Sequence, residues 1–280
     1  MNNAIPEPDV PRPCVRPVRM ALVLVAKAAV SGRVKTRLVS PAISAQQAAD
    51  VHTAFLGFLR SLVERLAESA PSCSPQPVAG DAQPVQTGKS GPGGDFVIQP
   101  ILFIDPLGQP PESFAWPGWR TIIQPQGDLG DRMRFCAKTC FADIADAIMF
   151  IGVDSVHLIP SHLLWIAQSL LKANAAMLPA HDGGYVALGL WPEALCLLDQ
   201  ISWGSAIVSR QTMERATQAG ILLSIGDQLP DVDTPEDLRL VMAAMAARQD
   251  SAAQALYTSL WSILPAKETG DTPHDKSQYD

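Results

Sequence analysis

Short apolar runs alternate with longer segments of mixed polarity along most of this chain. Residues 20–27 (MALVLVAK) and 146–152 (DAIMFIG) are almost continuously apolar, which is typical of strands buried on both faces of a sheet. Residues 45–68 instead repeat large apolar side chains every three or four positions, as an amphipathic helix does. The pattern therefore predicts that strands and helices alternate.

The same criteria predict the remaining elements. Strands are expected at residues 20–27, 96–105, 121–124, 146–152, 175–179, 185–190 and 221–225. Helices are expected at residues 45–68, 128–141, 160–172, 205–219 and 235–247, with a C-terminal helix within 251–265. This alternation predicts an α/β fold: a single Rossmann-like domain over residues 20–250, with a mostly parallel sheet and helices on both faces.

Three segments lack this pattern. Residues 1–19 are rich in proline and arginine and have no apolar stretch of the kind found in signal peptides, so we expect a disordered lead-in. Residues 71–95 are rich in proline and glycine and nearly devoid of large apolar side chains, which predicts a flexible insertion. The polar residues 266–280 are expected to form a disordered tail.

Composition narrows the choice of partners. A net charge of −7 and a pI near 5.2 argue against nucleic acid as the main partner. The five cysteines form neither a CxxC pair nor a zinc-binding spacing, which suits a reducing cytoplasm. No run of 18 apolar residues occurs, so we expect no membrane span. Small molecules remain as the expected ligands, and the oligomeric state is not indicated.

A single carboxylate, Asp154, follows the apolar run at 146–152. Open α/β sheets place their ligands at the carboxyl ends of strands, so Asp154 is expected to face a ligand. A late acidic loop contains Asp231 and Asp233 at alternate positions. Because Mg²⁺ or Mn²⁺ bound together with a nucleotide needs only one or two protein carboxylates, Asp154 and Asp233 are candidate metal ligands.

Each acidic segment also has a purely structural interpretation. Asp154 can cap the next helix or belong to a loop. In the late loop, Thr234 and Asp237 have the spacing of a capping box, which accounts for those two residues but not for Asp231 or Asp233.

A basic loop, Gly32-Arg33-Val34-Lys35-Thr36-Arg37, lies between the first strand and the first long helix. Backbone amides and cations at such a turn suit a pyrophosphate, so Arg33, Lys35 and Arg37 are candidate phosphate ligands. The loop is neither a Walker A loop nor a GxGxxG turn. The alternative is a solvated basic turn, and in either case we expect the side chain of Lys35 to be exposed to solvent.

Two further segments are candidates for ligand contacts. Gln126, Gly127 and Asp128 can contact a nucleobase, or Asp128 can simply begin a helix with Asp131 three residues later. The candidates for an acceptor pocket are Asp182, Gly183, Gly184 and Trp203. The first three can instead form a hairpin turn, and Trp203 can instead be a core residue before a helix. His157 and His162 lie close to Asp154 in sequence but lack the spacing of a metal-binding pair.

Taken together, several motifs resemble those of a known family. The segments GRVKTRL, QPQGDLGDRM, IGVDS, HDGGYVALGL and DVDTPEDL, with a tryptophan before a helix, resemble the DUF2064 family of bacterial glycosyltransferase-A-like proteins over roughly residues 20–245. The resemblance implies the superfamily of nucleotide-diphospho-sugar transferases, which includes glycosyltransferases and small nucleotidyltransferases. It also implies that Lys35 and its arginine neighbours bind phosphate, that Asp154 and Asp233 bind metal, and that Gln126 and Gly127 contact the base.

The chain departs from the family pattern at two places. Val156 and His157 stand where the family usually has a proline after Asp-Ser, and residues 28–31 lack the usual proline and glycine. We expect these changes to alter the pocket more than the fold.

The expected function is transfer of a sugar from a nucleoside diphosphate sugar to a small-molecule acceptor, with Mg²⁺ or Mn²⁺. The alternatives are a nucleotidyltransferase that releases pyrophosphate and a sugar-nucleotide binding protein without turnover. No catalytic base is identified from the sequence.

Overall fold

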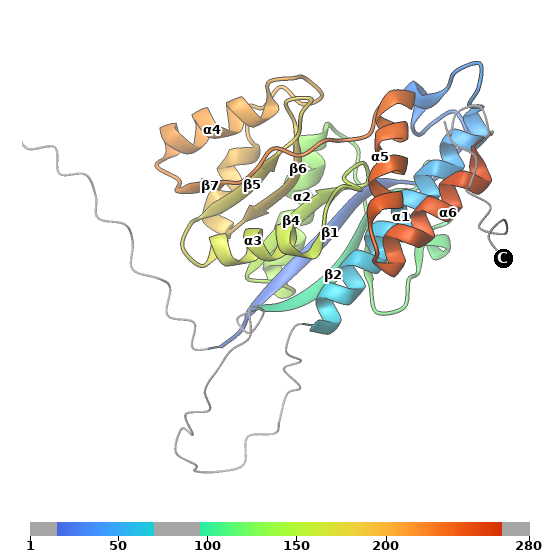
Figure 1. Cartoon of the computed structure of the whole chain (residues 1–280). Coiled ribbons are helices and arrows are strands. Elements are labelled where there is room, and N and C mark those ends of the chain that lie inside the picture. The colour runs from blue at the N-terminus through green and yellow to red at the C-terminus, as the bar shows by residue number, and fades with distance from the viewer. Residues whose placement is uncertain (1–15, 70–95, 265–280) are drawn as a thin grey trace, which may run out of the picture.

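The computed structural model describes residues 16–69 and 96–264, coloured from blue to red in Figure 1. The lead-in up to residue 15, the insertion at 71–95 and the tail at 266–280 lie outside the described residues. The first strand begins at Val18, so the predicted lead-in of residues 1–19 ends too late. The reason is a contact remote in sequence: Asp146 accepts a hydrogen bond from the backbone N–H of Arg19 at 3.0 Å.

The described residues form a seven-stranded sheet in the order β3-β2-β1-β4-β6-β5-β7. Its strands are β1 (Val18–Lys27), β2 (Phe96–Asp105), β3 (Arg120–Ile123), β4 (Ala147–Gly152), β5 (Ala175–Pro179), β6 (Tyr185–Leu190) and β7 (Leu223–Ile225). Strand β6 runs antiparallel to both of its neighbours, and the other pairs are parallel. The predicted α/β fold with a mostly parallel sheet is therefore confirmed.

Helices cover both faces of this sheet (Figure 1). They are α1 (Ala45–Ser69), α2 (Leu129–Asp143), α3 (Pro160–Leu170), α4 (Val208–Ala219), α5 (Pro235–Ala247) and α6 (Ser251–Ile263). Short 3₁₀ helices occur at Thr36–Leu38, Pro111–Phe114 and Pro192–Leu198. The sequence pattern predicted the six α-helices but not the 3₁₀ helices, since one or two turns are too short to show a period.

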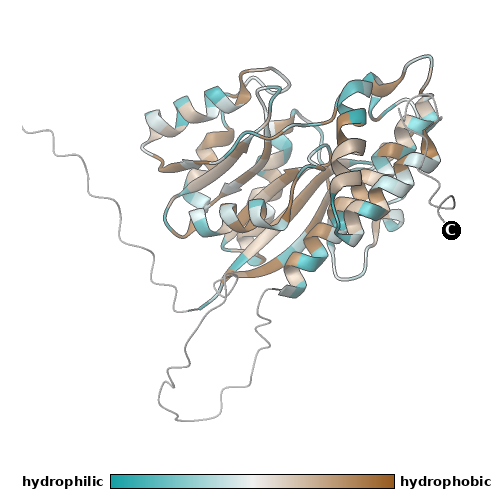
Figure 2. Cartoon of the chain, viewed as in Figure 1, coloured by the Kyte–Doolittle hydropathy of each residue, from teal (hydrophilic) through white to brown (hydrophobic). Residues whose placement is uncertain are grey.

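The two faces of the sheet hold two separate apolar clusters. Leu22 and Leu24 of β1 pack in a cluster with α1, α3, α5 and α6, whereas Ala21 and Val23 pack in a second cluster with α2, α4 and the 3₁₀ helix at 192–198. Alternate side chains of a strand point to opposite faces, so one continuous apolar run supplies both clusters. Figure 2 shows the hydrophobic colouring concentrated in these central strands.

The strand order creates a crevice at one edge of the sheet. Strand β1 lies between β2 and β4, so the connections that leave β1 and β4 run to opposite sides. In open α/β sheets such a topological switch point separates the loops at the carboxyl ends of the strands and opens a ligand site there. Across the ranges described, none of the helices has the length and apolar character needed to cross a bilayer.

Candidate functional site

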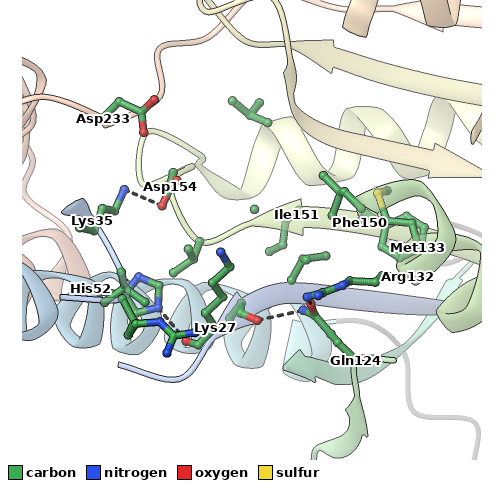
Figure 3. Close-up of a pocket in the computed structure, with 18 of the residues that line it drawn as sticks. Lys27, Lys35, His52, Gln124, Arg132, Met133, Phe150, Ile151, Asp154 and Asp233 are labelled. Carbon is green, nitrogen blue, oxygen red and sulfur yellow. Dashed lines mark hydrogen bonds and ion pairs between the residues drawn. The ribbon is translucent and has the colours of Figure 1, made fainter. Parts of the chain in front are cut away.

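A cavity of about 650 Å³ opens at the carboxyl ends of β1 and β4. This volume falls within the usual range for pockets that hold small molecules and cofactors. Figure 3 shows that charged side chains and the apolar side chains of Met133, Phe150 and Ile151 line it together. The polar and charged residues of the lining are Lys27, Arg33, Lys35, Thr36, Arg37, His52, Gln124, Arg132, Asp154, Tyr185 and Asp233.

Lys35 is held tightly by its surroundings. Its side chain is only 3% exposed, and its Nζ lies 2.5 Å from Oδ1 of Asp154. The same Nζ donates a hydrogen bond to the backbone oxygen of Val232 at 2.5 Å and lies 5.1 Å from the centroid of the Phe55 ring. The expectation of a solvated side chain is therefore wrong for Lys35, because these contacts with distant segments hold its ammonium group inside; its backbone is left-handed, with φ of 47°.

The two arginines of the basic loop are more exposed than Lys35. Arg37 Nη1 lies 2.7 Å from Asp233 Oδ2, with the Arg37 side chain 75% exposed. Arg33 is exposed and makes no side-chain hydrogen bond or ion pair with the part of the chain that the structure describes. All three basic residues line the cavity as predicted, but in a compact turn rather than an extended loop.

Asp154 follows β4 in a loop and faces the cavity. Helix α3 begins at Pro160 with Ile159 at its N-cap position, so the alternative that Asp154 caps this helix is wrong. The partner of the carboxylate is Lys35 (Figure 3). Asp154 and Asp233 are thus each ion-paired to a cation of the same basic loop.

Three carboxylates gather beside the cavity: Asp182, Asp231 and Asp233 each offer an oxygen atom, and these atoms lie within 4.8 Å of one another. Burial raises the pKa of Asp231, and the negative charges of Asp182, Asp233 and Asp154 raise it further. Thr234 and Asp237 form the predicted capping box at the start of α5, which leaves Asp231 and Asp233 free of that role. The donor set is all oxygen, as Mg²⁺ and Mn²⁺ prefer.

The predicted base-contacting segment contributes only its glycine to the cavity. Gly127 lines it, whereas Gln126 does not. Asp128 is the N-cap of α2 and forms a capping box with Asp131, so the structural alternative holds for Asp128. The polar side chains at this end of the cavity are instead Gln124 and Arg132, which the sequence reasoning missed.

Gln124 and Arg132 form one network with the ends of the strands. The amide nitrogen of Gln124 donates to the backbone oxygens of Ala26 and Phe103, each at 2.9 Å. Arg132 Nη1 donates to Gln124 Oε1 and to Asp105 Oδ2, both at 3.0 Å. Burial alone raises the pKa of Asp105, but hydrogen bonds from Leu107 N–H and Arg132 outweigh it and lower that pKa.

The candidates for an acceptor pocket lie outside the cavity lining. Gly183 has a φ of 89°, and the Asp182 side chain accepts a hydrogen bond from Gly184 N–H at 2.7 Å, so this segment is the turn before β6. Trp203 packs edge-on to Tyr185, with ring centroids 6.2 Å apart. Tyr185 lines the cavity, so Trp203 lies behind a residue of the lining and not in it.

Sequence reasoning also missed Lys27 and His52 as cavity residues. His52 belongs to the apolar stripe of α1 and is 3% exposed. Its Nε2 donates to the backbone oxygen of Lys27 at 2.9 Å, and burial lowers its pKa despite that hydrogen bond and the nearby Asp154. Lys27 is the last residue of β1. The sequence does contain a signal for each: His52 is a polar residue in the apolar stripe of a helix, and Lys27 is a cation at the end of an apolar strand.

Comparison with solved structures places the fold in a known group. The chain resembles a protein from Desulfovibrio desulfuricans G20 that is assigned provisionally to the nucleotide-diphospho-sugar transferases, with 23% identity, a TM-score of 0.68, and 87% of this chain and 97% of that chain covered. At this identity the similarity establishes the fold.

Weaker similarities are found to two other structures. One is 4-diphosphocytidyl-2C-methyl-D-erythritol synthase from Anaerococcus prevotii DSM 20548, at 10% identity and a TM-score of 0.48, covering 80% of this chain and 96% of that one. The other is the manganese complex of Rv0371c from Mycobacterium tuberculosis H37Rv, at 16% identity and a TM-score of 0.44, covering 80% of this chain and 97% of that one.

Sequence comparison gives a family match as well. No curated protein matches this chain. Residues 94–205 match the model of a family described as an uncharacterized protein conserved in bacteria, DUF2064. This segment includes β4, Asp154 and the Asp182 turn. The predicted resemblance to this family is therefore confirmed over residues 94–205.

Proposed function

We propose that this protein is a transferase that uses a nucleotide donor, and that it transfers a sugar from a nucleoside diphosphate sugar to a small-molecule acceptor. The observation that carries the proposal is the arrangement of charge in the cavity. Cations of the basic loop and the carboxylates Asp154 and Asp233 come from distant segments and meet at the carboxyl ends of β1 and β4. A diphosphate and a divalent cation together complement this mixture of charges.

The chain's own residues have distinct parts in this proposal. Asp154 and Asp233 would hold Mg²⁺ or Mn²⁺, with Asp231 and Asp182 next to Asp233 in the carboxylate cluster. When bound, the metal would offset the charge that develops on the leaving diphosphate. Arg33 and Arg37 line the same wall and would stabilise that charge by hydrogen bonding.

Asp231 lies in this carboxylate cluster, outside the cavity lining, and is proposed to accept a proton from an acceptor hydroxyl. Burial and the neighbouring carboxylates raise its pKa, and a raised pKa strengthens a carboxylate as a base. The cluster that contains it lies beside the Asp182 turn, where the acceptor is proposed to bind along with Gly183, Gly184 and Trp203.

One observation favours nucleotidyl transfer as a second candidate. Among the described residues that line the cavity, both carboxylates, Asp154 and Asp233, are already paired with cations. A phosphorylated acceptor is itself an anion and needs no base, so a cavity without a free carboxylate suits its attack on an α-phosphate. Product analysis separates the candidates: a nucleoside diphosphate indicates glycosyl transfer, and pyrophosphate indicates nucleotidyl transfer.

The binding step is tested by a thermal-shift screen of nucleotides and nucleotide sugars with and without Mn²⁺. A ligand that binds the folded state raises the melting temperature by mass action. We expect the shift for the parent protein to grow with Mn²⁺. Binding without product would instead identify a sugar-nucleotide binding protein.

The metal ligand is tested by Asp154→Asn, which keeps the size and an acceptor for Lys35 but removes the charge that attracts a hard cation. Nucleotide affinity should lose its dependence on Mn²⁺, while metal-free binding changes little. Asp227→Asn, at an exposed carboxylate outside the cavity lining, is the matched control. An unchanged response to Mn²⁺ in Asp154→Asn would remove Asp154 from the metal site.

A further inference from the structure

The cations around the cavity fall into two groups. Three of them form ion pairs: Lys35 with Asp154 at 2.5 Å, Arg37 with Asp233 at 2.7 Å, and Arg132 with Asp105 at 3.0 Å. Within residues 16–69 and 96–264, Lys27 and Arg33 line the same cavity and form no ion pair or side-chain hydrogen bond. The positive charge that is not already balanced therefore resides on Lys27 and Arg33.

Of these two, Lys27 has the fixed backbone. It ends β1, where it lies opposite Asp105 of β2 in the parallel register. Its backbone oxygen accepts the hydrogen bond from buried His52 at 2.9 Å. Arg33 instead lies in a turn of the basic loop. A cation on a rigid strand end keeps its position with or without a ligand, whereas one in a turn does not.

The side chain of Lys27 points into the cavity. In Figure 3 it rises from the end of β1 into the space between the Lys35–Asp154 pair and the Gln124–Arg132 network. It is exposed and, within the described ranges, makes no hydrogen bond or ion pair, so its ammonium group can reach a ligand without breaking one; its charge acts on Asp105 only at longer range. A lysine without a partner acts as a mobile point charge with three donors, which suits the several oxygen atoms of a phosphate.

Lys35 has the opposite character. To reach a phosphate directly, its Nζ would have to leave both Asp154 and the backbone oxygen of Val232, in a place where its side chain is 3% exposed. Breaking both contacts would leave a buried oxygen and a carboxylate without their donor, at a cost that a hydrated phosphate contact does not recover.

We infer that Lys27 is the lysine that contacts the diphosphate of the bound nucleotide, and that Lys35 is a positioning residue that holds the Asp154 carboxylate toward the cavity. This assignment rests on the proposed function. The sequence predicted Arg33, Lys35 and Arg37 as phosphate ligands, and the assignment replaces Lys35 in that set with Lys27. Lys27 interacts with the charge of the ligand, and Lys35 fixes the position of the Asp154 carboxylate.

The test is calorimetric titration of inorganic pyrophosphate and of the diphosphates of the four ribonucleosides. For the parent's best ligand, Lys27→Met should raise Kd about tenfold, equivalent to about 1.4 kcal/mol. Its melting temperature should stay within about 1 °C of the parent, since an exposed lysine without a partner contributes little stability. Lys27→Arg should restore most of the affinity, because the charge and donors return.

Lys138→Met is the matched control, at an exposed lysine of α2 outside the cavity lining, and it should leave Kd unchanged. Two results would overturn the inference. In the first, Lys27→Met binds like the parent while Lys35→Met loses affinity at an unchanged melting temperature. In the second, the parent binds none of the probes, which refutes the proposed function as well; the first result refutes only the division of roles.

Discussion

Replacement of Lys35 should destabilise the fold, and the structure gives a scale for the effect. Lys35→Met keeps most of the aliphatic stem but removes the ammonium group, which lies 2.5 Å from Asp154 Oδ1 and donates to the Val232 oxygen at 2.5 Å. The Asp154 side chain as a whole is 42% exposed, although its Oδ1 is buried, so the penalty of a buried unpaired charge applies only in part. The lost hydrogen bond to Val232 and the lost charge pair together contribute about 2 kcal/mol.

For a domain of this size, about 2 kcal/mol corresponds to a fall in melting temperature of roughly 4–8 °C. The assay is urea unfolding followed by circular dichroism, together with a thermal scan. Arg37→Met is the matched control, because Arg37 makes the equivalent pair with Asp233 but is 75% exposed. Exposed pairs contribute at most about 1 kcal/mol, so the control should lose far less stability.

The backbone of Lys35 allows a second comparison. Its φ of 47° is left-handed, a conformation in which glycine is not strained. Lys35→Gly and Lys35→Ala both remove the side chain, but the glycine variant should be more stable by about 1 kcal/mol. Equal melting temperatures for Lys35→Met and the parent would refute the reasoning, since Lys35 would then be a solvated loop residue.

Two further changes test other features of the fold. Gly183→Ala should destabilise the fold by more than 2 kcal/mol in urea unfolding, because a Cβ at this position, with φ of 89°, would lie 2.1 Å from the backbone oxygen of Ala206. The control Gly32→Ala, where φ is 72° and nothing lies within 4 Å, should cost only about 1 kcal/mol. Equal losses of stability in the two variants would show that the contact with Ala206 is relieved cheaply. Burial raises the pKa of Asp146, but hydrogen bonds from two arginines outweigh it and set the pKa well below its usual range. The ionised Asp146 therefore stabilises the fold fully above the unfolded-state pKa of about 3.9, and this stabilisation is lost as the pH falls toward the folded-state pKa. Asp146→Asn should thus unfold with a weaker pH dependence below about pH 4 than the parent, and identical acid-unfolding profiles would contradict this assignment.

The sequence alone determined which segments are strands and which are helices. Strands β2, β5 and β6 and the helices α5 and α6 lie at or very near their predicted residues, because apolar runs and helical stripes extend over several positions. The limits of α4 were less accurate: the helix was predicted from residue 205 and begins at Val208. The first turn of a helix has no periodicity of its own, so its start is decided by local contacts.

The sequence also identified the residue types that gather at the site but not their partners. Arg33, Lys35, Arg37, Asp154 and Asp233 all line the cavity. The first four lie in the loops that follow β1 and β4, which meet at the switch point, and Asp233 reaches it from the segment between β7 and α5. That prediction needed only the order of strands and loops along the chain.

Only the tertiary structure decided which charges neutralise each other. The partners of Lys35 and Arg37 lie 119 and 196 residues away, as Asp154 and Asp233, and no local pattern relates them. The same holds for Lys27: within residues 16–69 and 96–264 it forms no ion pair, which is evident only when Asp105, the carboxylate opposite it in the sheet, is seen to pair with Arg132. Burial and ion pairing depend on contacts between distant segments. Those contacts decide whether a lysine holds a neighbouring side chain in position or is available to bind a ligand.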